Sequence, residues 1–362
     1  MNINNVQYSG NWKPSPPDSR DYTIYHEKVS NFFRDIGVHY LIQNSEQLPS
    51  YIDNRFYCSN VKDQGIFNAC SIYAVGAAFE YMENKTFHYS EDVSIAYIYK
   101  KARMLEGIVG DNGAFIRDTM KVIADNGAPY NSCWELNYFN YDDNPNLHPD
   151  CDIQANQRKI VNYVRLDDGS DSQTVLNNIK ANIAVGQPVV FGIQTFVSFY
   201  GTIPIIGDIY YPCSLDIPTG WHAMCIVGYD NNRIITNPTC LDDESTTGAF
   251  LVKNSFGSLW ANKGYCWIPY EFLLNGKMLD IWTITTITDS YHNSCEDRTC
   301  NKILGPGIDE CSDIGSVCVP TNDPISYITL GAVIGLTIST ILIGHHIHKK
   351  IKKHRHRKTI TK

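Results

Sequence analysis

The chain has 362 residues, of which 43% are hydrophobic, and it includes 23 tyrosines and 14 phenylalanines. It can therefore bury one sizeable core or two packed subdomains, and wholesale disorder is excluded. The net charge of −8 is uneven, because residues 345–362 hold eight of the 30 basic side chains and none of the 38 acidic ones. Residues 1–344 carry a net charge of −16. An acidic body repels phosphate backbones, which argues against nucleic acid as a partner.

The N-terminal residues 1–47 are polar and contain Pro14, Pro16 and Pro17. Proline fixes its own φ angle and lacks a backbone donor, so this composition predicts an extended arm that lies on a surface. The globular body is expected to follow at residues 48–290.

Hydrophobic periodicity changes halfway along this body. The first half has helical spacing, for example in residues 70–85 and 115–128. The second half contains short apolar or alternating runs bounded by Gly, Asn and Pro, which predict strands. These runs are residues 187–193, 222–230, 233–237 and 248–255. A helical lobe followed by a β lobe is an α+β arrangement, and such a chain has a cleft between its halves.

The C-terminal residues 291–362 differ from the body in composition. Residues 291–324 contain four cysteines among Gly, Pro and Asp, which predicts a small disulfide-stapled stalk; a metal site is the alternative, but its usual paired short spacings are absent. Residues 325–344 carry no charge and would span roughly 30 Å as a helix, the thickness of the bilayer core. We interpret them as a transmembrane helix, with a buried core helix as the alternative.

The basic tail, residues 345–362, follows this span directly. A cationic flank on one side is typical of membrane anchors and is attracted to anionic lipid, so the bilayer is an expected partner. The same asymmetry predicts a single-pass protein with a cytosolic tail and a lumenal or exoplasmic body. The N-terminus shows no apolar secretory signal, however, and a tail-anchored topology would reverse the orientation.

Three segments each place one polar side chain in an apolar or glycine-bordered setting. Cys70 lies where a loop becomes a helix, His222 opens an apolar strand, and Asn254 ends another. A helix N-terminus and a neighbouring imidazole both favour thiolate over thiol, which produces a nucleophile. An asparagine oxygen can hold that imidazole in one tautomer. Gln64, six residues before the thiol, can donate its amide to the oxyanion of acyl transfer.

These segments resemble those of the papain-like cysteine peptidases, which include the cathepsins. The resemblance rests on VKDQGIFNACSIYA (61–74), GWHAMCIVGYD (220–230) and FLVKNSFGSLWANKGYCWIPY (250–270). His222 follows Cys70 by 152 residues and Asn254 follows it by 184, close to the family's wide spacing. The segments LPSYIDNR (48–55) and PPDSRDY (16–22) are similar to those of divergent bacterial and giant-virus members.

The resemblance implies a two-lobe fold with a helical lobe and a β-barrel-like lobe. It implies a monomeric cysteine endopeptidase that acts on polypeptides without a cofactor or metal. Cys70 would be the nucleophile, His222 the base and acid, Asn254 its orienting partner and Gln64 the oxyanion donor. Within GDNGAFIRD (110–118), a segment similar to the family's substrate-binding strand edge, Gly113 and Ala114 would present backbone to the substrate. Residues 1–47 would be the only room for a short pro-segment.

The chain also departs from the family pattern. Phe67 and Ser71 stand where many members have a cysteine and an aromatic residue, and Phe256 replaces a tryptophan that shields the Asn–His contact. These departures leave open a catalytically inactive papain-like binding or structural membrane protein. Acyl transfer to an amine would use the same residues as hydrolysis.

The other cysteines lack the setting of Cys70. Cys225 is expected in the core. The remaining six of the body are disulfide candidates whose pairing the sequence leaves unassigned: Cys58, Cys133, Cys151, Cys213, Cys240 and Cys266.

Overall fold

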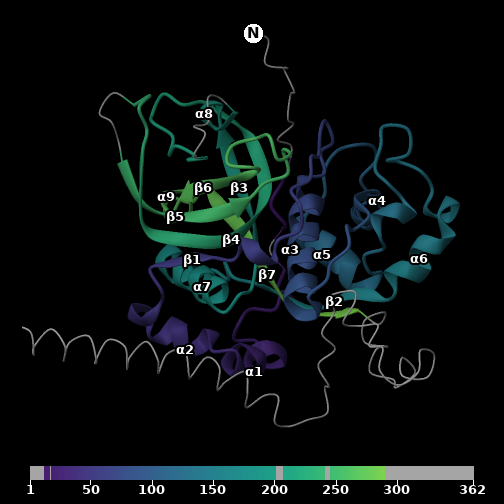
Figure 1. The fold of residues 1–362 in the computed structure, drawn as a ribbon, viewed down its shortest axis with the longest axis horizontal. Helices are drawn as coiled ribbons and strands as arrows, with labels where there is room; N and C mark the ends of the chain where they lie inside the picture. The colour runs from purple at the N-terminus through teal and green to yellow at the C-terminus, as the bar shows by residue number, and fades with distance from the viewer. Residues whose placement is uncertain (1–11, 17, 201–206, 241–244, 290–362) are drawn as a thin grey trace, which may run out of the picture. The chain divides into compact units, whose positions relative to one another are not determined.

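The computed structural model describes residues 12–16, 18–200, 207–240 and 245–289 (Figure 1). All of them belong to one unit, residues 1–294. The predicted stalk (291–324), membrane span (325–344) and basic tail (345–362) lie outside the described residues. Within the part of the chain that is described, no helix is both long and apolar enough to cross a bilayer.

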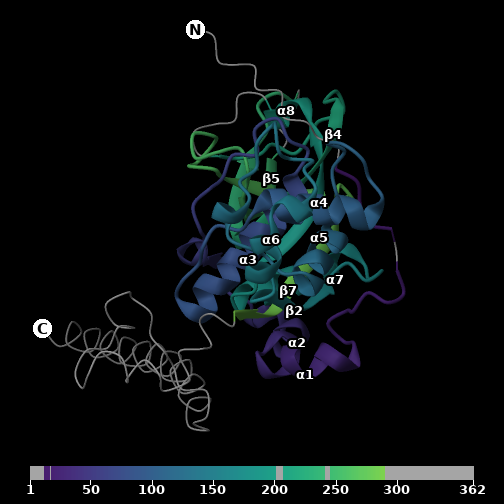
Figure 2. The ribbon, with the colours of Figure 1, turned by 90° about the vertical axis from the view of Figure 1, so that its right-hand side faces the viewer.

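The helical lobe is built around α3 (Cys70–Phe87), which confirms the helix predicted over 70–85. The next helix, α4 (Ile95–Glu106), begins after Ser94, whose hydroxyl accepts a hydrogen bond from the backbone N–H of Tyr97. It ends at Gly107 in the left-handed conformation that glycine tolerates. Figure 2 shows this lobe facing the viewer. Its other helices and short 3₁₀ turns are α5 (Ile116–Asp125), α6 (Pro149–Ala155), η2 (Arg55–Tyr57), η3 (Asn131–Cys133) and η4 (Pro145–Leu147).

The second lobe is an antiparallel sheet that curls in the manner of a barrel (Figure 1). Its strand order is β2-β7-β3-β4-β5-β6, with β1 paired to β4. The strands are β1 (Tyr51–Asp53), β2 (Arg158–Arg165), β3 (Val189–Phe196), β4 (Pro218–Thr236), β5 (Ser245–Lys253), β6 (Tyr265–Pro269) and β7 (Met278–Asp289). Three helices accompany them: α7 (Ser172–Ala184), α8 (Val197–Tyr200) and α9 (Glu271–Leu274). The α+β class is confirmed.

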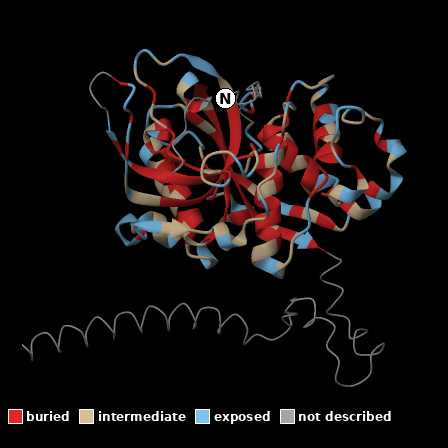
Figure 3. Cartoon of the chain, turned by 45° about the horizontal axis from the view of Figure 1, so that its top comes forward, coloured by how far each residue is buried: buried red, intermediate tan, exposed pale blue. Residues whose placement is uncertain are grey.

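Two hydrophobic clusters lie on opposite faces of the sheet. One packs α3 and α4 against sheet residues such as Ala223 and Cys225, and the other packs α7 against residues such as Met224 and Ile226. Figure 3 shows the buried residues concentrated on the sheet and on the inner helices. The nucleophile candidate lies where α3 meets β4, so the border between the two clusters is also the place where the site forms.

The N-terminal arm is only partly extended, so that prediction is wrong for its second half. Residues Glu27–Asp35 form α1 and Val38–Gln43 form α2, followed by η1 (Ser45–Gln47). Val29 and Phe33, four residues apart, lie on one face of α1 and are buried in the hydrophobic cluster around α7. Phe32 and Ile36 pack against the same cluster, so the face has helical spacing that the polar composition of residues 1–47 obscured.

Four of the six disulfide candidates are paired, as Cys133–Cys151 and Cys213–Cys240. The prediction is wrong for Cys58 and Cys266, which are free. Cys266 lies on β6 inside the barrel core, where a thiol behaves as a small hydrophobic side chain. Cys225 is buried in the core, as expected.

Candidate active site

Cys70 is the first residue of α3 and is 2% exposed. Ala69, the residue before it, makes no side-chain cap, and the N–H groups of Cys70 and Ser71 at the helix start lie against the thiol. The thiol lies against the backbone N–H of Ala223 on β4. Ala223 directly follows His222, and the structure therefore brings the helix start beside the strand that carries the imidazole.

His222 is 1% exposed and is bonded to Asn254, with 2.8 Å between Nε2 of the imidazole and Oδ1 of the amide. The same Oδ1 accepts the backbone N–H of Ser255 at 2.8 Å. A backbone N–H can only donate, so this contact identifies the amide atom as oxygen and makes His222 Nε2 the donor. Nδ1 then carries a lone pair, and it has no hydrogen-bond partner among the described residues. This is the atom a general base needs.

Aromatic rings cover the His222–Asn254 contact. Phe256 stacks on the imidazole with 4.8 Å between ring centroids, and Trp260 meets Phe256 edge-on at 5.4 Å. These rings exclude water from the bond and hold the imidazole plane. The cover expected from Phe256 is confirmed.

Burial acts on both groups of the pair. It raises the pKa of the Cys70 thiol to about 11, while the N–H groups of Ala223 and Ser71 act in the other direction. It lowers the pKa of His222 to about 4, against the effect of the Asn254 bond. A single charge is therefore disfavoured in the closed site. Transfer of the thiol proton to the imidazole creates two opposite charges at once, and their attraction offsets the lost hydration.

Gln64 is buried, and both ends of its amide are held. Its Oε1 accepts the hydroxyl of Ser255 at 2.6 Å, and its Nε2 donates to the carbonyl of Phe67 at 2.8 Å. The backbone N–H of Gln64 also donates to the carbonyl of Ser255 at 2.8 Å. Ser255 directly follows Asn254, so these bonds tie the oxyanion candidate to the segment that carries Asn254. The sequence did not single out Ser255.

Gly113 and Ala114 lie in the loop before α5 and do not form the strand edge that the resemblance implied. Gly113 has a φ of +82°, which explains the glycine, and its N–H donates to the hydroxyl of Tyr99 at 3.1 Å. The carbonyl of Ala114 accepts the hydroxyl of Ser71 at 2.7 Å. Ser71 therefore braces this loop against α3 from the position where the family usually has an aromatic residue.

The first described residues of the arm lie between the two lobes and contact both of them. The indole of Trp12 fills the space over Gly192, where a Cβ would come within 1.9 Å of it, and packs near Trp221 with 6.1 Å between centroids. Gly192 pairs with Ala223 across β3 and β4. In Figure 1 this purple segment runs between the barrel and the blue helices.

The arm is also bonded to both sides of the groove. Ser15 donates its N–H and its hydroxyl to the buried carboxylate of Asp280 on β7, each at 2.8 Å. On the helical side, the backbone N–H of Arg117 donates to the Ser15 hydroxyl at 3.3 Å. Lys13 borders a pocket together with Ala114 and Phe115. Sequence patterns gave no sign of this placement, because the groove is assembled from distant strands.

Comparison with known proteins agrees with this geometry. The profile described as papain family cysteine protease matches residues 48–274. An uncharacterised peptidase C1-like protein of Acanthamoeba polyphaga mimivirus is 28% identical over 316 residues, which cover 83% of this chain and 94% of that protein.

Two solved structures extend the comparison. Xylellain, a cysteine protease from Xylella fastidiosa, superposes with a TM-score of 0.58 and 27% identity over 77% of this chain and 96% of xylellain. The cysteine protease and lectin-like domains of a surface layer associated protein of Clostridium difficile share the fold, with a TM-score of 0.53 and 18% identity over 67% of this chain and 52% of that one. The chain belongs to the papain family of cysteine proteases, which are hydrolases, as a divergent member.

Proposed function

We propose that the chain hydrolyses peptide bonds with Cys70 as nucleophile, His222 as base and acid, Asn254 as its orienting partner and Gln64 as oxyanion donor. The observation that carries this proposal is the Oδ1 of Asn254, which accepts from Ser255 and His222 and so leaves Nδ1 of the imidazole unprotonated and unpartnered among the described residues. The thiol of Cys70 lies against the backbone N–H of Ala223, the residue after His222 on β4.

In this mechanism Nδ1 of His222 takes the proton of Cys70, and the sulfur attacks the carbonyl carbon of the peptide. The electron pair of the carbonyl moves to its oxygen, which is stabilised by the N–H of Cys70 and Nε2 of Gln64. The amine then leaves with the proton from the imidazolium. Water attacks the thioester, with His222 again as base, and releases the acid and the thiol. The test is peptide hydrolysis by the native chain and by Cys70→Ala, which should lack it.

We propose in addition that the arm acts as a short pro-segment. Two observations support this proposal: the indole of Trp12 packs over Gly192, and Ser15 is hydrogen-bonded to Asp280 and Arg117. A substrate strand laid along Ala114 would need the space that residues 12–15 take up.

Replacing Trp12 with alanine is expected to raise kcat/KM about 10-fold or more while leaving kcat unchanged. A buried indole of roughly 200 Å² contributes about 5 kcal/mol, so its removal shifts the arm toward the open state. Peptide hydrolysis over a range of substrate concentrations checks this, with the exposed Tyr25 of the same arm changed to alanine as control. An unchanged kcat/KM in Trp12→Ala would show that the arm does not compete with substrate.

We also propose that residues 325–344 anchor the protein in a membrane, with the body on the lumenal or exoplasmic side. The support is the uncharged run and the basic residues 345–362 after it. In carbonate-washed membranes the full chain should stay in the pellet, and a chain ending at residue 324 should be released. Recovery of the full chain in the supernatant would contradict anchoring, and protease protection of the body reports its side.

A further inference from the structure

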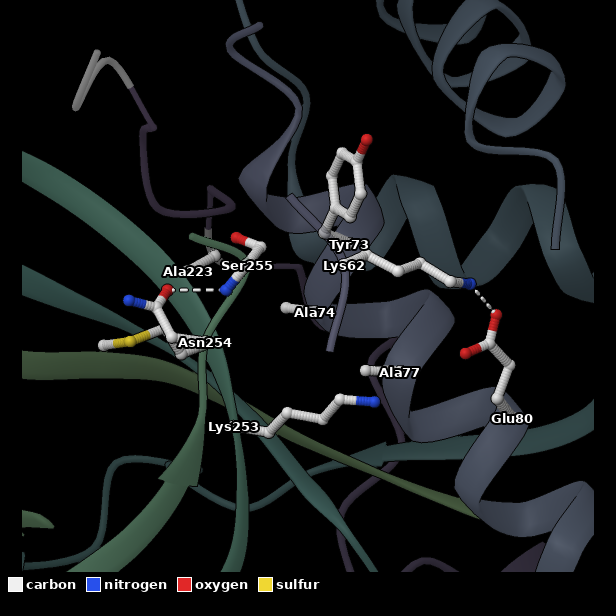
Figure 4. A pocket seen from close by; sticks show the side chains of 10 residues that line it. Lys62, Tyr73, Ala74, Ala77, Glu80, Ala223, Lys253, Asn254 and Ser255 are labelled. Atoms are coloured by element: carbon white, nitrogen blue, oxygen red, sulfur yellow. Dashed lines mark hydrogen bonds and ion pairs between the residues drawn. The ribbon is translucent and has the colours of Figure 1, made fainter. Parts of the chain in front are cut away.

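A cluster of buried charges lies farther along α3 from Cys70, on the side of the helix that faces β4 and the end of β5. It consists of Ser59, Lys62, Glu80 and Lys253, which we call the Glu80 cluster. Figure 4 shows Lys62, Glu80 and Lys253 lining a pocket together with Ala223, Asn254 and Ser255. The pocket thus touches the neighbours of both His222 and Gln64.

The cluster is a continuous chain of hydrogen bonds. The ammonium of Lys253 donates to the carbonyl of Ser59 at 2.8 Å and to its hydroxyl at 2.9 Å. That hydroxyl donates to Oε2 of Glu80 at 2.5 Å, and Lys62 donates to Oε1. Oε1 also accepts the backbone N–H of Val93 at 2.9 Å. Both carboxylate oxygens are therefore occupied.

Burying these charges costs free energy of desolvation, because Glu80 is 1% exposed and Lys253 is 5% exposed. Burial raises the pKa of Glu80, but Lys62 and Lys253 outweigh it and hold that pKa below its usual value. Burial lowers the pKa of Lys253, and Glu80 acts against this. Each charge thus persists because of the other. Apolar side chains of similar volume would satisfy packing alone at no greater cost.

The chain positions of the cluster connect it to the site. Lys253 directly precedes Asn254, and Lys62 lies two residues before Gln64. Glu80 lies on α3, the helix that begins with Cys70. The segments that carry Gln64, Cys70 and Asn254 therefore converge on one carboxylate, which Lys253 reaches through Ser59.

We propose that Glu80 is a positioning residue: through Lys253 and Lys62 it holds Asn254 and Gln64 in register with the thiol on its own helix. This inference rests on the proposed function. A displacement of about 1 Å at a reacting group can reduce the rate on the order of 100-fold, so the ties need only prevent small movements.

Glu80→Gln should lower kcat about 10- to 100-fold with little change in KM. It also leaves the ammonium of Lys253 without a carboxylate in its hydrogen-bond chain, whereas Lys62 keeps its ion pair with Asp92 at 3.1 Å, so thermal stability falls. The double variant Glu80→Gln/Lys253→Met removes the ammonium of Lys253 and should regain stability without regaining kcat. Return of kcat together with stability would show that the cluster serves folding only and would overturn the proposal, as would an unchanged kcat in Glu80→Gln.

Glu83 provides a matched control on the same helix. It forms a buried ion pair with Arg158, whose Nε and terminal nitrogen donate at 2.8 and 2.7 Å, and among the described residues no hydrogen bond joins its side chain to the segments of the site. Glu83→Gln should lose stability and keep kcat; an equal loss of kcat in this variant would count against the proposal. If the native chain itself lacks hydrolysis that depends on Cys70, the proposed function fails, whereas native activity with unaffected Glu80→Gln refutes only the positioning role.

Discussion

Cys70→Ala is expected to lose peptide hydrolysis by on the order of 10⁴-fold or more, because no other group in the site can form the thioester. The substitution removes only a sulfur atom at the start of α3. Helix packing around Ile72 and Val75 is left in place, so circular dichroism and thermal unfolding should remain close to those of the native chain. Initial rates on an unfolded protein substrate provide the measurement.

Cys225→Ala is the matched control for this loss. Cys225 is also a buried free thiol on the strand of His222, and burial raises its pKa with no imidazole to accept the proton. This variant should keep native kcat. Hydrolysis that survives in Cys70→Ala, or disappears in Cys225→Ala, would move the nucleophile elsewhere.

Gln64→Ala is expected to lower kcat on the order of 10²- to 10³-fold, the usual effect of removing one oxyanion donor, or roughly 3 kcal/mol of barrier. The loss should appear in kcat, because the side-chain amide of Gln64 bonds to the carbonyl oxygen of the substrate only when negative charge develops on that oxygen. Labelling of Cys70 by a thiol-directed epoxide should persist, since the nucleophile and its base remain.

Ser255→Ala offers a graded comparison for Gln64. It deletes the hydroxyl that holds Oε1 at 2.6 Å and leaves the bond from Nε2 to Phe67, so a smaller loss, about 10-fold, is expected. Steady-state kinetics of both variants check the order. A change confined to KM in Gln64→Ala would mean that the amide binds substrate and does not stabilise the transition state.

Local patterns predicted most of the elements that carry the site. The helix that begins at Cys70, the strand that carries His222 and the strand that ends just before Asn254 are confirmed, because these segments are rich in apolar residues. Two predicted runs, 222–230 and 233–237, are one strand. The polar pair Asn231–Asn232 lies where the β4–β5 register shifts, between Asp230 and Ile234, and a bulge of this kind resembles a turn in sequence.

The features that the sequence did not predict depend on contacts between distant residues. The indole of Trp12 can pack where it does only because residue 192 is a glycine. Ser15 is hydrogen-bonded to Asp280, which is 265 residues away. The same holds for the Glu80 cluster, since Ser59 and Lys253 are separated by 194 residues. No periodicity or spacing encodes such pairs, and each residue alone would be assigned to an ordinary surface or core.

Site-resolved alkylation at pH 5.5 measures most directly whether the sulfur and the imidazole act as a pair. At this pH an ordinary thiol is about one-thousandth ionised, and burial alone would leave Cys70, with a pKa of about 11, far less so. In the Trp12→Ala chain, Cys70 should react with iodoacetamide on the order of 100-fold faster than the half-buried Cys58. A Cys70 rate equal to or below that of Cys58 would mean that His222 does not take the proton.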